Sequence, residues 1–124
     1  MIAALSLLLA IAAQDRVATD VHIPEPFHGK WFSDPYMCDP GLDSQVLYVS
    51  DQRMAFYEAA ADPKAVEKIS QREVVLSALV THYDGETSME TYRLRLSKDV
   101  SRLTETAPGW RVVRHWCRVK KHDA

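Results

Sequence analysis

The sequence contains only two cysteines and five histidines among its 124 residues, and none of them stands at a metal-binding spacing. Neither Cys-x-x-Cys nor closely spaced histidine pairs occur, although structural zinc sites usually depend on them. The sequence also lacks the Gly-x-Ser-x-Gly elbow, the phosphate-binding glycine loop and the His-Glu-x-x-His motif. We therefore expect no catalytic residue, no metal ligand and no cofactor, and we do not expect an enzyme.

Neither sign of charge dominates, because 15 basic residues stand against 17 acidic ones. The absence of a basic excess argues against a nucleic-acid binder. The charges are unevenly distributed, with acidic residues between positions 14 and 51 and basic residues between positions 111 and 121. We expect these two segments to be neighbours in the fold and to offset each other. The alternative is a basic rim for an anionic partner.

No apolar run reaches the roughly 20 residues that a membrane-spanning helix needs. Residues 1–13 form an apolar run with no charge before Asp15, and Ala10-Ile11-Ala12 offers the small-x-small pattern that signal peptidase recognises. The sequence thus predicts a signal peptide at residues 1–13, a periplasmic or secreted location, and no membrane span after cleavage. The alternative is a buried helix of a cytosolic protein.

Cys38 and Cys117 lie near opposite ends of the predicted mature chain. Exported proteins usually pair their cysteines because their compartment is oxidising, so we predict a disulfide between these two. Two alternatives use the same sulfurs. His115, two residues before Cys117, could activate a thiolate nucleophile. His28 with Met37 and Cys38, or His115 with Cys117, could bind copper.

The segment after the signal peptide, residues 14–27, contains two prolines and no periodicity, which predicts an extended lead-in. Residues 28–124 then form a single β-domain. Runs at 44–50 and 53–60 are rich in β-branched and aromatic residues, which predicts a hairpin. Asp62-Pro63-Lys64 is expected to break the chain before a modest strand, although the alanine, lysine and glutamate content also permits a helix there.

The strongest hairpin signal is Asp84-Gly85 between two alternating runs, residues 73–83 and 87–97. Tyr92, Leu94 and Leu96 are expected to point inward. Further turns at residues 98–100 and 108–109 lead to strands at 101–105 and 110–119. The sequence thus predicts an all-β fold. We expect a small antiparallel up-and-down barrel or a strongly coiled sheet of seven to eight strands, preceded by the signal-peptide helix.

Gly29-Lys30-Trp31 opens the predicted sheet, and basic residues lie on the predicted last strand. This arrangement resembles the calycin pattern of lipocalins and avidin-like barrels. The resemblance implies that Arg111, Arg114 or Arg118 stacks on the Trp31 indole by a cation–π contact. The layout of signal, Gly-x-Trp, cysteine and meander is also similar to small exported bacterial β-proteins of unassigned function, a resemblance that implies no activity.

Alternation along residues 110–119 places Trp116 between Arg114 and Arg118 on the face opposite Cys117. We expect the Cys117 face to be buried, which leaves Trp116 partly exposed and suggests a contact site. The predicted binding residues are therefore Trp116, Arg114, Arg118 and Trp31.

These patterns predict an exported, monomeric, non-enzymatic binding module. Its partner would be a protein, as for the small periplasmic inhibitors of lysozyme, or a small ligand. A cavity above about 300 Å³ would favour the small ligand. The alternative is a cell-envelope structural or stress protein without a discrete site, and a periplasmic copper binder ranks behind both.

Overall fold

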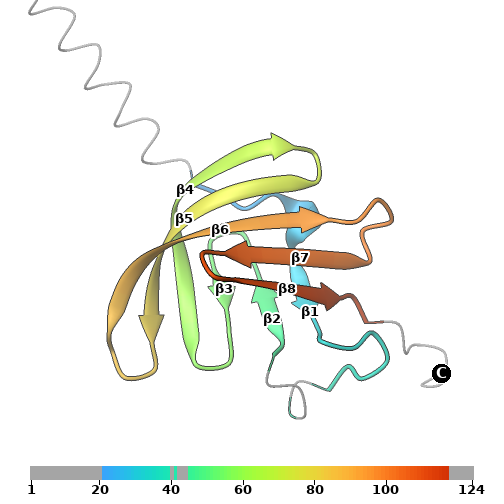
Figure 1. The fold of residues 1–124 in the computed structure, drawn as a ribbon, viewed down its shortest axis with the longest axis horizontal. Helices are drawn as coiled ribbons and strands as arrows, with labels where there is room; N and C mark the ends of the chain where they lie inside the picture. The colour runs from blue at the N-terminus through green and yellow to red at the C-terminus, as the bar shows by residue number, and fades with distance from the viewer. Residues whose placement is uncertain (1–20, 40, 42–44, 118–124) are drawn as a thin grey trace, which may run out of the picture.

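The computed structural model describes residues 21–39, 41 and 45–117. These residues form one short 3-10 helix and a single antiparallel sheet of eight strands in chain order (Figure 1). The elements are η1 (Glu25–Phe27), β1 (Gly29–Trp31), β2 (Leu47–Val49), β3 (Met54–Ala55), β4 (Ala59–Ser70), β5 (Glu73–His82), β6 (Thr87–Leu96), β7 (Arg102–Ala107) and β8 (Trp110–His115). The predicted all-β class, up-and-down order and strand number are confirmed.

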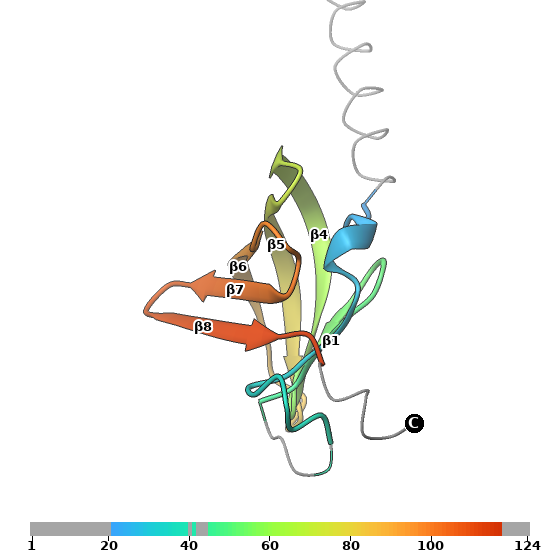
Figure 2. The same cartoon turned by 90° about the vertical axis from the view of Figure 1, so that its right-hand side faces the viewer.

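The sheet curls until its first and last strands meet, as Figure 2 shows. Phe32, directly after β1, forms an antiparallel bridge with His115 at the end of β8. Its hydrogen bonds, from Phe32 N to His115 O and from His115 N to Phe32 O, measure 2.8 and 2.6 Å. We call this contact the seam. It brings the sheet to a nearly closed, barrel-like shape and pairs the two outer edges at one position.

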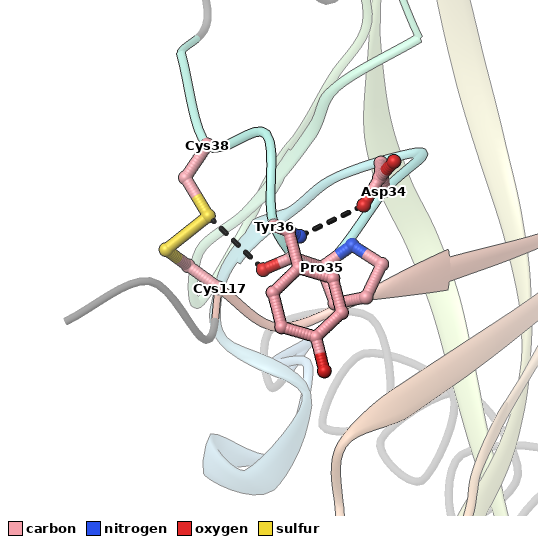
Figure 3. Close-up of a disulfide and its surroundings, with 5 residues drawn as sticks. All are labelled: Asp34, Pro35, Tyr36, Cys38 and Cys117. Carbon is pink, nitrogen blue, oxygen red and sulfur yellow. Dashed lines mark hydrogen bonds between the residues drawn. A yellow bond between two sulfur atoms is a disulfide. The ribbon is translucent and has the colours of Figure 1, made fainter. Parts of the chain in front are cut away.

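The disulfide predicted between Cys38 and Cys117 lies beside the seam (Figure 3). The two Cα atoms are 5.7 Å apart, and the bridge joins residues separated by 79 positions. Cys38 follows a turn in which the backbone N–H of Tyr36 donates to the Asp34 carboxylate at 2.8 Å. The bond therefore links the segment after β1 to the end of β8 and reinforces the seam covalently.

The core is built from the inward face of the predicted alternating strands. Gly85 turns β5 into β6 with a φ of 89°, a conformation that glycine adopts without strain. The buried residues of this hairpin are Val74, Leu76, Ala78, Val80, Tyr92, Leu94 and Leu96. Arg93 and Arg95 between them point outward and are exposed. The predicted turn and the predicted facing of β6 are both confirmed.

Within the predicted lead-in, the described residues pack into the core. Residues 25–27 form the 3-10 helix η1, and both Ile23 and Phe27 are buried in the main hydrophobic cluster. The lead-in is therefore not extended at residues 25–27, where the chain forms η1. The backbone carbonyl of Phe27 also accepts a 3.0 Å hydrogen bond from the Trp31 indole, which ties the helix to β1.

The break predicted at residues 62–64 and the alternative helix there are both wrong. β4 runs through Pro63, and the chain bends instead at residues 56–58, between β3 and β4. The pairing of β4 with β5 shifts register between Pro63 and Ala65. Such a bulge is where a strand accommodates proline, which has no N–H to donate. The predicted strand at 53–60 is consequently divided between β3 and the start of β4.

The predicted signal peptide at residues 1–13 and the predicted binding residue Arg118 lie outside the described residues. Within the described part of the chain, no helix is both long enough and apolar enough to cross a membrane.

Candidate functional site

The three predicted binding residues that the structure describes do not form one surface. Trp116 is 44% exposed, as expected, but Trp31 is fully buried and Arg114 is only 3% exposed. On β8 the faces are the reverse of the prediction, because Arg111 and Val113 are exposed. The prediction assigned the faces from Cys117. β8 ends at His115, so the position of Cys117 does not report which face of the strand is inside.

The exposure of Trp116 has a structural explanation. Its ring covers Gly29, where an added Cβ would lie 2.2 Å from the nearest ring atom. The ring also meets Trp31 edge to face, with centroids 5.2 Å apart. The aromatic partner of the Gly-x-Trp motif is therefore another tryptophan. The cation–π contact expected from Arg114 is wrong because its guanidinium binds Glu105 and the Gln45 carbonyl instead.

Trp31 and Trp116 also border a hollow of about 320 Å³ next to η1. His28 lies in the same hollow, and its ring nitrogen is 2.7 Å from the Ile23 carbonyl oxygen. Val100 also lines the hollow, and its φ of 58° is a conformation that is strained for a β-branched residue. No buried charged group lies among the lining residues, so the hollow offers little to orient a ligand.

The cysteines and histidines singled out in the sequence do not assemble a reactive centre. The two sulfurs are bonded to each other, so neither is a thiolate nucleophile or a free metal ligand in this structure. Among the described residues, no group of three or more His, Cys, Asp or Glu side chains is placed to hold a metal ion.

A larger cavity lies where the β3–β4 bend, the end of β5 and one face of β8 converge. Its volume is about 530 Å³, and it is open to solvent on one side. The lining consists of residues 45–46, 56–59 and 82–83 together with Trp110, Val112 and Arg114. We call it the Arg114 cavity, because Arg114 is its buried charged residue.

Arg114 is held in place by two neighbours. Its Nε donates a 2.8 Å hydrogen bond to the Gln45 carbonyl, and its Nη1 donates to Oε1 of Glu105. The guanidinium has five N–H donors in all. Among the described residues, Nη2 has no hydrogen-bond partner, and Arg114 itself borders the cavity.

Glu105 on β7 is the second buried charge, with no exposed surface. Its Oε2 atom is buried without a hydrogen-bond partner. Burial raises the pKa of this carboxyl above its usual value, and the ion pair with Arg114 opposes that shift only in part. Sequence reasoning missed Glu105. The available signal was its position two residues after Leu103 on the predicted strand 101–105, which places both residues on one face.

Two of the lining residues, Phe56 and Trp110, belong to an aromatic cluster. Tyr92 stacks on Phe56 with ring centroids 5.9 Å apart and meets Trp110 edge to face at 6.5 Å. Burial, reinforced by the charges of Glu105 and Glu90, raises the pKa of the Tyr92 phenol to about 12. Tyr92 therefore stays neutral at physiological pH, and it braces two aromatic rings that line the cavity together with Arg114.

Comparison with protein-family models, with curated proteins and with solved structures gives no match for this chain. We therefore argue its function from the residues of the cavity.

Proposed function

We propose that this chain is an exported, non-enzymatic binding module that holds a small molecule in the Arg114 cavity. The observation that carries the proposal is a cavity of about 530 Å³ with aromatic walls and one buried, incompletely hydrogen-bonded guanidinium. Small-molecule sites typically have volumes of about 300–1,000 Å³, with apolar walls and a few oriented polar groups. Export is supported by the apolar run at residues 1–13 and by the Cys38–Cys117 bond.

A protein partner held by Trp116 is the less well supported reading. Its ring packs on Gly29 and Trp31, so its partial exposure needs no partner to explain it. The position of a ligand on the molecule would separate the two readings directly.

The proposal is tested by amide NMR on the oxidised mature chain, titrated with a library of small aromatic compounds with and without acidic groups. We expect compounds to shift the amides of residues 56–59, 82–83 and 110–114. Ala59→Phe places a ring in the cavity and should abolish these shifts. Ala65→Phe makes the same substitution at an exposed position of β4 and should preserve them.

Equal binding to the Ala59→Phe and Ala65→Phe proteins would contradict the proposal. Shifts confined to the surroundings of Trp116 would instead favour the surface reading.

A further inference from the structure

The Arg114–Glu105 pair is balanced in charge but not in hydrogen bonding. Arg114 contributes one positive charge and Glu105 at most one negative charge, and both side chains are almost fully buried. Buried ionic groups are costly unless their charges and hydrogen bonds are satisfied. Within the described residues, Oε2 of Glu105 is buried without a hydrogen-bond partner. The hydrogen bonds of the guanidinium run through Nε and Nη1, which leaves Nη2 for a further acceptor.

Nη2 of Arg114 and Oε2 of Glu105 differ in what can reach them. Arg114 borders the cavity, so an acceptor group entering from solvent can approach Nη2. Glu105 has no exposed surface, so a ligand cannot approach Oε2 without displacing other side chains. A proton, in contrast, can reach Oε2 and neutralise the carboxylate in place. The guanidinium can thus bind an acceptor group of a ligand, and the Glu105 carboxylate can take up a proton when it does.

An anionic head group on Nη2 would change the charge of the interior. Arg114 would then face two negative groups, the ligand and ionised Glu105, and the buried cluster would carry a net charge of −1. Uptake of one proton from solvent by Oε2 returns the sum to zero, because ligand (−1), Arg114 (+1) and neutral Glu105 then cancel. Burial already favours the protonated form of Glu105.

No titratable group on the neighbouring described elements offers a second site for proton uptake beside Arg114 and Glu105. Tyr92 on β6 stays a neutral phenol, and Glu90 lies farther along the same strand. Glu58 and His82 lie at the exposed rim of the cavity, where a histidine proton could also attract an anion. The rim histidine therefore needs its own control.

The walls define the remainder of the ligand. Trp110 and Phe56 present ring surfaces beside Arg114, and they are braced by their contacts with Tyr92. Aromatic side chains pack well against flat apolar bodies. A planar or aromatic body of modest size would lie against them while its head group reaches the guanidinium.

We propose that the Arg114 cavity binds an organic monoanion with a flat apolar body, its carboxylate, sulfonate or phosphate head on Nη2 of Arg114, and that Glu105 takes up one proton as it binds. This inference rests on the proposed function and specifies its ligand class. By linkage, the affinity for an anion rises as the pH falls, by up to about tenfold per pH unit while one proton is taken up.

Two dyes with similar aromatic bodies provide the test on the oxidised wild-type chain. Anilinonaphthalene sulfonate carries a permanent anionic head, and phenylnaphthylamine carries none. Fluorescence titrations between about pH 5 and about pH 8 should show tighter sulfonate binding at the acidic end and a pH-independent affinity for the amine. Calorimetry in two buffers of different ionisation enthalpy should show uptake of up to about one proton with the sulfonate only. Loss of binding of both dyes in the Ala59→Phe variant would place them in the cavity.

Four variants assign the groups. Arg114→Gln should lose most sulfonate affinity and retain the amine, whereas Arg111→Gln, an exposed arginine on the same strand, should retain both. Glu105→Gln imitates the protonated carboxyl and should bind the sulfonate at pH 8 about as tightly as the wild type does at pH 5. His82→Gln should keep the wild-type pH dependence. If Arg114→Gln fails to fold, the double variant that carries both Arg114→Gln and Glu105→Gln replaces it, because it leaves neither charge of the ion pair in the interior.

The outcomes distinguish the two proposals. If neither dye entered the cavity, the proposed function would fail and this inference with it. If the amine bound but the sulfonate did not, or bound without pH dependence, the anion inference would be wrong and small-molecule binding would stand. Loss of the pH dependence in His82→Gln would assign the proton to the rim and overturn the role of Glu105.

Discussion

Gly29 is subject to two constraints that no side chain can meet together. Its φ of 131° is one that residues with a Cβ rarely adopt, and the Trp116 ring occupies the space where a Cβ would stand. Gly85 shares only the first constraint, since its φ is 89° and no atom lies within 4 Å of the added Cβ. Comparing the same substitution at the two glycines therefore separates the cost of backbone strain from the cost of steric overlap with Trp116.

Gly29→Ala is expected to lower the free energy of unfolding by about 2–4 kcal/mol, because strain and overpacking add. Gly85→Ala should cost only about 1 kcal/mol. Urea unfolding of both variants measures the difference. Adding Trp116→Ala to Gly29→Ala should recover part of the loss, since the overlapping ring is gone. Equal costs at the two glycines would show that Trp116 does not pack against Gly29.

The raised pKa of Glu105 predicts a pH dependence of stability with a defined sign. In the unfolded chain this carboxyl ionises near 4.5, whereas burial makes it hold its proton to a higher pH in the folded chain. Between these two values the folded state binds more protons, so the free energy of unfolding falls as the pH rises, by at most about 1.4 kcal/mol per pH unit.

Denaturation across that window should show a steeper decline for the wild type than for Glu105→Gln, which cannot titrate. Asp99 does not confuse the comparison. Hydrogen bonds from Ser101 and Ser97 lower the pKa of Asp99, so its stabilisation is lost only below its ordinary value of 3.8. Identical slopes for the two proteins would mean that Glu105 ionises as it does in water.

At this scale the sequence identified Arg114 but not its environment. The alternation of residues 110–119 correctly separated Arg114 from Arg111, yet the choice of the inner face relied on Cys117, which lies beyond the strand. Whether an arginine faces inward depends on a buried partner on another strand, here Glu105. One strand read alone does not contain that information.

Among the elements, β1 and β8 are joined by the shortest backbone pairing in the sheet. The seam consists of one bridge with two backbone hydrogen bonds, while β4 and β5 pair over most of their length. The Cys38–Cys117 bond compensates for this short pairing by holding the neighbouring segments together.

Replacing both cysteines by serine should lower the free energy of unfolding by up to about 4.5 kcal/mol, the loop-entropy estimate for a closure of 79 residues. Amide hydrogen exchange at Phe32 and His115 should accelerate more than exchange in β5, because local opening begins where pairing is short. Reduced wild-type protein serves as the control and should resemble the serine variant. Uniform acceleration through the whole sheet would contradict a role specific to the seam.

The strands and turns were predicted correctly where the signal lay in adjacent residues. They were predicted wrongly where contacts with another part of the chain determine the structure. Asp84-Gly85 fixes a hairpin through turn chemistry that needs no distant contact. Pro63 was expected to end a strand, but β5 extends alongside it and a bulge accommodates the ring. The helix η1 was missed because three residues have no periodicity, and its place is set by burial of Phe27 and the hydrogen bond from Trp31.

For the whole molecule, export is the prediction that links the sequence to the disulfide. Expressed in a bacterium with a periplasm, the full chain should be recovered from that compartment with its first 12 or 13 residues removed, as measured by intact mass. Leu8→Arg interrupts the apolar run and should retain the unprocessed chain in the cytoplasm. A matched Thr19→Arg change lies outside the run and should not. Cytoplasmic recovery of the unprocessed wild type would contradict export.

The seam also bears on the order in which the molecule folds. Every strand from β1 to β8 pairs with the next one along the chain, so each hairpin can form soon after its residues become available. The contact between Phe32 and His115 is different, because it waits for nearly the last described residues. Ring closure is therefore expected to be the slow, final event, and a chain truncated before His115 would remain an open ribbon.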